Sequence, residues 1–187
     1  MTDSEIIKLI LQGDREKYRV LVDRYQSLIF RTCMGFVHNK EDADDLTQDV
    51  FIQVFRSLSR FKGEAAFSTW IYRIAVNASL NRIRKSKGYS LLKRIGLTSG
   101  ESNVPDPSLL IPEDEDPESV LIREEHHAWL QNALDSLPEK QRTALVLSKY
   151  DELPQKDIAA ILNTTEGAVE ALIQRAKANL RKKLKKK

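Results

Sequence analysis

Apolar residues recur every three or four positions along most of the chain, and few segments alternate with a period of two. This is the spacing of amphipathic helices, each of which buries one apolar face. We therefore expect helices everywhere except residues 88–118, where glycine and proline gather, and we predict an all-α fold. In the first half, the first expected helix is capped by Asp3 or Ser4 and ends near Gly13. The second is capped by Asp14 and carries an apolar stripe of Tyr18, Leu21, Val22, Tyr25, Leu28 and Ile29. The third runs from about Lys40 to Leu58, and the fourth from Ser68 or Thr69 to about Lys87.

Residues 88–118 differ from the rest of the chain in composition. They hold four of the six prolines and end in the acidic run EDEDPE. Such a segment cannot bury enough apolar surface to offset the entropy lost on ordering, so we interpret it as a flexible acidic linker. The predicted organisation is a helical module at 1–87, the linker at 88–118 and a second helical module at 119–187. Each module is small enough for its core to be thin.

The segment from Pro154 to Lys177 has the spacing of a helix-turn-helix. Pro154 suits the first turn of a helix, Asn163 suits the left-handed residue of a tight turn, and Thr164 or Thr165 can cap the helix that follows. That second helix has an apolar face and a polar outer face that can enter a DNA major groove. The outer arc carries Gly167, Glu170, Ala171, Gln174, Arg175 and Ala178. The alternative is an ordinary helical hairpin.

The third expected helix carries an acidic stripe. On a helical wheel, one band holds Asp42, Asp45, Asp49, Gln53 and Arg56. The expected core face of the same helix holds Leu46, Val50, Phe51, Val54, Phe55 and Leu58. Acidic residues are favoured near a helix N-terminus, which explains Asp42 and Asp45 as a solvated face. Asp49 lies beyond the reach of that effect, so we interpret the stripe as a docking surface for a basic protein partner.

The fourth expected helix carries a band of arginine and asparagine, formed by Arg73, Asn77, Asn81 and Arg84. These side chains can donate to phosphates and base edges. Aromatic residues gather near the start of this helix, namely Phe61, Phe67, Trp70 and Tyr72. Rings beside cations suit single-stranded nucleic acid, because bases stack on rings and phosphates meet arginine or lysine. For Phe67 and Trp70, a place in the core is the alternative.

The formal net charge is only +3, so nucleic-acid binding cannot be inferred from it, but the charge is unevenly distributed. An acidic segment separates two basic ones, and the chain ends in RKKLKKK, a tail that suits phosphate contact or is simply solvated. The single cysteine, Cys33, excludes an intramolecular disulfide and fits a core position. Neither a signal-peptide pattern nor a membrane-length apolar run is present, so we expect a soluble, cytoplasmic protein without membrane contact.

The residues give little support to an enzyme. We find no glycine-rich phosphate loop, no metal-ligand spacing and no pairing of a nucleophile with a base, so we expect no catalytic residues, no metal and no cofactor. The three histidines, His38, His126 and His127, are isolated or merely adjacent to one another, and we expect them on the surface.

Three motifs follow one another in order. The first is Asp42-x-x-Asp45-Leu46-x-Gln48-Asp49-x-Phe51, the second is Phe67-x-Thr69-Trp70-Ile71-x-x-Ile74-Ala75-x-Asn77, and the third is Leu137-Pro138 followed by the helix-turn-helix. Together they resemble the extracytoplasmic-function (ECF) sigma factors of bacteria, the minimal members of the sigma-70 family. The resemblance extends from about Tyr18 to Leu184, with the linker matching only in kind.

The resemblance implies a transcription initiation factor that works as a subunit of RNA polymerase. The N-terminal module would dock on the clamp helices of the largest polymerase subunit through Asp42, Asp45, Leu46, Gln48, Asp49 and Gln53. It would open the −10 element and hold a flipped base through Phe61, Lys62, Phe67, Ser68, Thr69, Trp70, Arg73, Asn77, Asn81 and Arg84. The C-terminal module would lie near the flap region and read the −35 duplex through Thr164, Thr165, Glu166, Gly167, Glu170, Ala171, Gln174, Arg175 and Lys177. An anti-sigma factor is a further implied partner.

Two positions depart from the family pattern. Glu170-Ala171-Leu172 stands where many members have a basic or polar trio, so the −35 sequence cannot be carried over. Val76 stands where members often have a polar or basic residue, which leaves the choice of −10 base open.

Two other functions remain open. A stand-alone helix-turn-helix regulator would leave the acidic stripe and the arginine–asparagine band unexplained. An RNA- or single-strand-binding protein would use the surface at 67–85, and its helix-turn-helix would be incidental.

Overall fold

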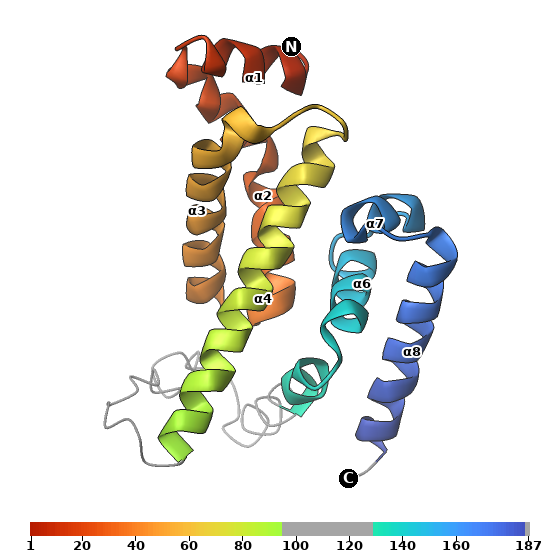
Figure 1. Cartoon of the computed structure of the whole chain (residues 1–187). Coiled ribbons are helices and arrows are strands. Elements are labelled where there is room, and N and C mark those ends of the chain that lie inside the picture. The colour runs from red at the N-terminus through yellow and green to blue at the C-terminus, as the bar shows by residue number, and fades with distance from the viewer. Residues whose placement is uncertain (95–128, 186–187) are drawn as a thin grey trace, which may run out of the picture.

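The computed structural model describes residues 1–94 and 129–185, and every regular element in these ranges is a helix (Figure 1). The N-terminal module contains α1 (Asp3–Leu11), the 3-10 turn η1 (Arg15–Lys17), α2 (Tyr18–Val37), α3 (Lys40–Ser57), the 3-10 turn η2 (Leu58–Arg60) and α4 (Phe67–Arg94). The C-terminal module contains a helical stretch at 129–135, α6 (Glu139–Lys149), α7 (Gln155–Leu162) and α8 (Glu166–Leu184). The predicted all-α fold of two helical modules is confirmed.

The cap of the first helix is Thr2, so the predicted caps, Asp3 and Ser4, are wrong. Thr2 and Glu5 form a capping box, in which the Thr2 hydroxyl accepts from the Glu5 amide and the Glu5 carboxylate accepts from the Thr2 amide. Asp3 binds α2 instead, accepting a hydrogen bond of 2.6 Å from the Tyr25 hydroxyl. Asp14 makes no side-chain cap, and α2 starts only after the intervening 3-10 turn.

Helix α4 is longer than predicted. It continues past Lys87 to Arg94, so the first seven residues of the predicted linker are helical. A single glycine such as Gly88 costs a helix only about 1 kcal/mol relative to alanine, and no proline follows before Pro105. The rest of the predicted linker, 95–118, and two of the histidines, His126 and His127, lie outside the described residues.

Helices α2, α3 and α4 pack around one core, and α1 lies across their end (Figure 1). The apolar stripes predicted on α2 and α3 line this core, which buries Ile6, Leu21, Ile29, Cys33, Leu46, Val50, Val54, Leu58, Phe67 and Ile71. Phe55 was wrongly assigned to the core face, because its side chain is 40% exposed. Its ring packs edge-on against Tyr18 at the margin of the apolar arc, with centroids 4.9 Å apart.

The helix-turn-helix has the predicted local geometry. Asn163 adopts the left-handed conformation between α7 and α8, with φ 50° and ψ 55°. The Thr165 hydroxyl caps α8 by accepting from the Ala168 amide. Pro154 is the residue just before α7, at its N-cap. Buried apolar residues of both helices, including Ile158 and Val169, pack in one cluster.

The two modules share a hydrophobic cluster. Helix α7 packs on α4, and α6 packs on α2. Phe36, Tyr72 and Val76 of the N-terminal module are buried in one cluster with C-terminal residues Ala144, Val146, Leu147, Ile158, Ala159, Ile161, Val169 and Ile173. The helical periodicity of each segment could not predict this contact, because it gives the apolar face of a helix and not the element that covers it.

Candidate nucleic-acid and protein interfaces

The outer face of α8 is open to solvent. Glu170, Gln174 and Arg175 are exposed there, and Ala171 and Lys177 are half-buried. At the start of the helix, Thr164, Thr165, Glu166 and Gly167 are exposed as well. The backbone amides of this first helical turn and the cations further along α8 are the groups that contact phosphates when a helix enters a major groove. All nine predicted −35 residues are therefore at least partly accessible to solvent.

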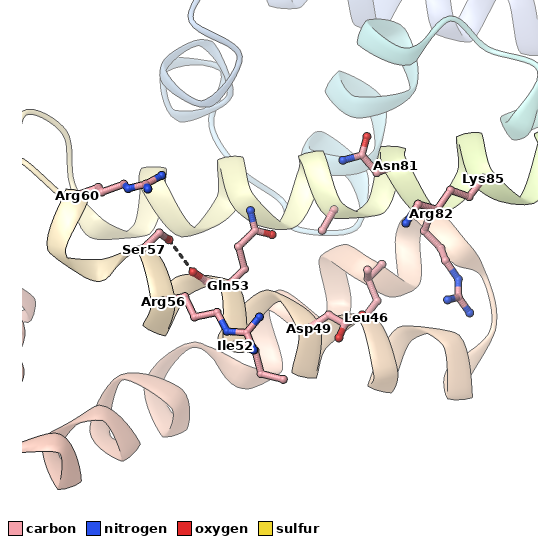
Figure 2. A pocket seen from close by; sticks show the side chains of 11 residues that line it. Leu46, Asp49, Ile52, Gln53, Arg56, Ser57, Arg60, Asn81, Arg82 and Lys85 are labelled. Atoms are coloured by element: carbon pink, nitrogen blue, oxygen red, sulfur yellow. Dashed lines mark hydrogen bonds between the residues drawn. The ribbon is translucent and has the colours of Figure 1, made fainter.

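A groove of about 610 Å³ runs between α3 and α4, and Figure 2 shows the side chains that line it. The acidic stripe reaches this groove at Asp49 and Gln53, while Asp45 and Gln48 lie exposed on α3. Of the predicted docking residues, only Leu46 is buried, and it forms part of the groove floor.

The groove is not acidic as a whole. Its lining includes one carboxylate, Asp49, and four cationic side chains, which are Arg56, Arg60, Arg82 and Lys85. Asp42, at the start of the stripe, forms an ion pair with Arg82 across the two helices. The acidic stripe predicted on α3 is thus only one part of this surface, because α4 contributes cations that the pattern of α3 alone cannot reveal.

The arginine–asparagine band of α4 is divided between two surroundings. Arg73 donates to the carbonyl oxygens of Ile161 at 3.2 Å and Ala160 at 2.6 Å, in the last turn of α7. Arg84 donates through two nitrogens to the carboxylate of Glu139 on α6, at 2.6 Å each. Asn77 is exposed and lines a cleft of about 490 Å³ between the modules. Asn81 lines the α3–α4 groove instead and accepts from Arg84.

The aromatic residues before and within α4 belong mainly to the core. Phe67 is only 3% exposed, so its ring is not available to stack on a base, and that expectation is wrong for this conformation. Phe61 and Trp70 are half-buried against it, with ring centroids 5.6 and 5.7 Å from that of Phe67. Ser68 and Thr69 are half-buried in the first turn of α4. Tyr72 is buried in the cluster between the modules.

A hollow of about 330 Å³ lies between α1 and the loop that precedes α4. Its wall includes the predicted residues Phe61 and Lys62. It also includes Lys8 of α1 and Gln12, the residue that directly follows α1. Sequence reasoning missed these last two residues, since nothing in the pattern of α1 places it beside a loop fifty positions later in the chain. The lysines and the amide give this hollow the donors that phosphates and base edges accept from.

The remaining chemistry of the described residues is sparse. They contain no group of three or more histidine, cysteine, aspartate or glutamate side chains that could hold a metal ion. Burial raises the pKa of the Cys33 thiol to about 11, so this cysteine is a structural residue of the core. Within the same ranges, no helix has the length and apolar content needed to cross a membrane.

The sequence also matches known proteins. The family profile for Sigma-70 region 2 matches residues 21–88, and that for Sigma-70, region 4 matches residues 127–180. The ECF RNA polymerase sigma factor SigW of Bacillus subtilis is 34% identical over 96% of this chain and 95% of its own length. RNA polymerase sigma-H factor of Pseudomonas aeruginosa is 31% identical over 97% of this chain and 93% of its own. The chain therefore belongs to the ECF group of the sigma-70 family of RNA polymerase sigma factors.

Two solved structures share the fold. CnrH, solved in complex with the cytosolic domain of CnrY, superposes with a TM-score of 0.64 at 21% identity, covering 98% of this chain and 97% of CnrH. The sigma factor RpoE of Bartonella quintana, solved with the anti-sigma factor NepR, gives 0.58 at 20% identity, covering 91% of this chain and 98% of RpoE. These matches support the two-module helical architecture.

Proposed function

We propose that this protein binds core RNA polymerase in the cytoplasm and directs it to specific promoters, without chemistry of its own. The observation that carries the proposal is the presence, on one chain, of an exposed helix-turn-helix reading face on α8 and an accessible docking groove between α3 and α4. A protein that only bound DNA would need the first surface and not the second. The proposed division is docking and −10 opening by 1–87, a linker at 88–118, and −35 reading by 119–187.

The α3 face is the proposed site for the clamp helices of the largest polymerase subunit. Asp45, Gln48 and Asp49 project from α3 at one side of the groove, and Arg56 and Arg60 follow two and three turns later. A partner helix that fits this face therefore carries cations opposite the aspartates and acidic residues opposite the arginines. Such alternation fixes the register of two helices and disfavours other partners.

The loop before α4 and the hollow beside it form the proposed site for a base of the opened −10 element. The 330 Å³ hollow exceeds the volume of one nucleobase, and the half-buried ring of Phe61 forms one of its walls. Extruding a base from the stack costs a few kcal/mol, which a pocket and nearby cations must offset. Lys62 and Lys8 supply those cations at the rim.

The outer face of α8 is the proposed reader of the −35 duplex. Arg175 and Lys177 are suited to phosphate and guanine contacts, whereas Glu170 can only accept, from the amino group of cytosine or adenine. This uncommon glutamate predicts a −35 sequence with one of these two bases opposite position 170. The flap region of polymerase would hold the module at the correct spacing from the −10 element.

An anti-sigma factor is the remaining proposed partner. The two structures of similar fold were each solved as a complex, CnrH with the cytosolic domain of CnrY and RpoE with the anti-sigma factor NepR. A partner of that kind would cover one or both modules of this protein.

The proposal is tested by run-off transcription from a library of genomic promoters with bacterial core polymerase, in the presence and absence of this protein. We expect protein-dependent transcripts that share two upstream elements. Specific duplex binding by the protein alone, with no transcripts, would instead support a stand-alone helix-turn-helix regulator.

A further inference from the structure

We propose that the protein has a closed state in solution, in which its own C-terminal module occupies the α2–α4 face of the N-terminal module. Release of this face would then be required before α4 can meet the −10 strand. The required release rests on the proposed function, whereas the closed state concerns the free protein alone.

Apolar packing is the first support for closure. Phe36, Tyr72 and Val76 of the N-terminal module are each at most 5% exposed, and they form one buried cluster with residues of α6, α7 and α8. This cluster is separate from the core shared by α1, α2, α3 and α4. Withdrawing the C-terminal module would expose an apolar face on the N-terminal module, a change that the hydrophobic effect opposes.

Directed polar contacts fix the register of the two modules. The Thr32 hydroxyl on α2 donates to the carboxylate of Asp151 at 2.8 Å, and Arg31 lies 3.3 Å from the same group. Arg142 on α6 is 2% exposed, donates to the Phe36 carbonyl oxygen and lies 5.7 Å from the centre of the Phe36 ring. Arg73 donates to carbonyls at the C-terminal end of α7, where the helix dipole favours a cation.

The two modules approach each other closely at Gly35 on α2. A Cβ atom at this position would lie 2.7 Å from a methyl carbon of Val146 and 3.1 Å from the ring of Tyr150. Carbon atoms at 2.7 Å overlap strongly, so α2 and α6 can pack at this distance only over a residue without a side chain. Gly35 lies in the last turn of α2. Glycine within a helix costs stability, and the close approach of α6 gives that cost a structural reason.

The closed state also contains buried polar groups that would gain contact with water if the modules separated. The Tyr72 hydroxyl is buried and has no hydrogen-bond partner among the described residues. The Asp151 side chain is fully inaccessible to solvent, and this burial raises the pKa of its carboxyl. Its ion-pair partner, Arg31, is half exposed. Unpaired or desolvated polar groups oppose closure, so the two states are expected to differ little in free energy.

The closed state leaves the proposed polymerase site accessible. On α4, the inter-module cleft is lined by Arg73, Asn77 and Arg84, whereas the α3–α4 groove is lined by residues from a different face, including Arg82 and Lys85. Closure therefore covers the α4 part of the proposed −10 surface, and it leaves both the loop hollow and the docking groove open. The structure assigns an order of events in which polymerase binds the closed protein first, and promoter reading follows release of the C-terminal module.

The test is a Gly35→Leu wedge in the full chain, with Gly88→Ala as the matched control. Gly88 also lies in a helix, but a Cβ there would meet no atom within 4 Å. Spin labels on cysteines introduced at the exposed positions Ser59 and Ala178 report the separation of the modules, while the buried Cys33 remains unlabelled. We expect one narrow distance for the unmodified chain and the control, and a longer, broader distribution for the wedge, corresponding to about a tenfold shift toward the open state.

Gly35→Ala is the second variant if leucine impairs folding, since alanine favours the helix and still overlaps Val146. Adding Val146→Ala to it removes the opposing methyl groups and should restore the narrow distance. A broad distribution in the unmodified chain, or one that Gly35 substitutions do not change, would overturn the closed state.

Binding of a single-stranded −10 oligonucleotide by the free protein separates the two parts of the proposal. The wedge should strengthen this binding about tenfold relative to the control. If the labels show opening while strand binding stays unchanged, closure stands, but the required release of α4 and its assignment to the −10 strand are wrong.

Discussion

The two polar faces of α4 have similar residues and different surroundings. The face toward α3 carries Asn81, Arg82 and Lys85 along an open groove, whereas the face toward the C-terminal module carries Arg73, Asn77 and Arg84 along a cleft. Arginine and asparagine occur on both. What distinguishes the faces is which part of the chain supplies the partner. Arg82 pairs with Asp42 of the neighbouring α3, whereas Arg73 and Arg84 bind α7 and α6, which belong to a module far away in the sequence.

The largest expected effect concerns the open groove. Reversing Asp45 and Asp49 together to lysine should weaken binding to core polymerase about 100-fold, because charges aligned with a complementary partner would become repulsive. The fold should persist, since both side chains are exposed. Affinity is measured by fluorescence titration with core enzyme. Asp44→Lys, an exposed aspartate outside the stripe, is the control, and an equal loss in that variant would contradict the docking assignment.

The next largest effect concerns DNA binding by the outer face of α8. Arg175→Ala should weaken binding of a −35 duplex by about 2 kcal/mol and leave polymerase binding unchanged, because Arg175 is exposed on the proposed reading face. Electrophoretic mobility shifts of the polymerase complex at fixed salt measure the change. Arg19→Ala on α2 is the control for a general loss of positive charge. Similar losses in the two variants would indicate nonspecific attraction in place of base and phosphate contacts.

A third prediction separates the two faces of α4 directly. Asn77→Ala should slow promoter opening about tenfold while polymerase docking remains normal, since Asn77 lines the cleft and not the groove. Asn81→Ala should leave the rate of opening nearly unchanged, because Asn81 lines the groove. Permanganate reactivity of unpaired thymines, followed over time, measures opening. Equal effects of the two variants would remove the functional distinction between the faces.

The smallest expected effect is local. Thr165→Ala removes the hydroxyl that caps α8 and should lower the free energy of unfolding of the C-terminal module by about 1 kcal/mol. Thr164→Ala should change it less, because the Ala168 amide bonds to Thr165 and not to its neighbour. Urea denaturation followed by circular dichroism provides the measurement. If the larger loss came from Thr164, the cap would be misassigned.

Local chemistry made part of the fold predictable from sequence. The left-handed turn at Asn163, the cap at Thr165 and the apolar stripe of α2 depend on residues close together in the chain, and the structure confirms all three. The cap of α1 was predicted wrongly as Asp3 or Ser4, since the neighbouring Thr2 also has a side chain that can cap a helix. Only the reciprocal bond with Glu5 selects Thr2.

The candidate sites were less predictable, because their character depends on contacts between distant segments. Helical spacing placed Phe67 beside a cationic band, but packing against Tyr25 and Trp70 buries its ring. The cations of the α3–α4 groove and the contribution of Gln12 to the loop hollow come from elements that meet only in the folded chain. The same holds for Gly35, whose importance appears only once α6 lies against it.

Permanganate footprinting of a promoter identified by transcription tests the central claim most directly. The claim is that this chain and core polymerase open promoter DNA together, with α4 covered in the free protein. We predict reactive thymines in the −10 element only when both proteins are present. Reactive thymines with this chain alone, or none with the two together at a promoter they bind, would contradict the account.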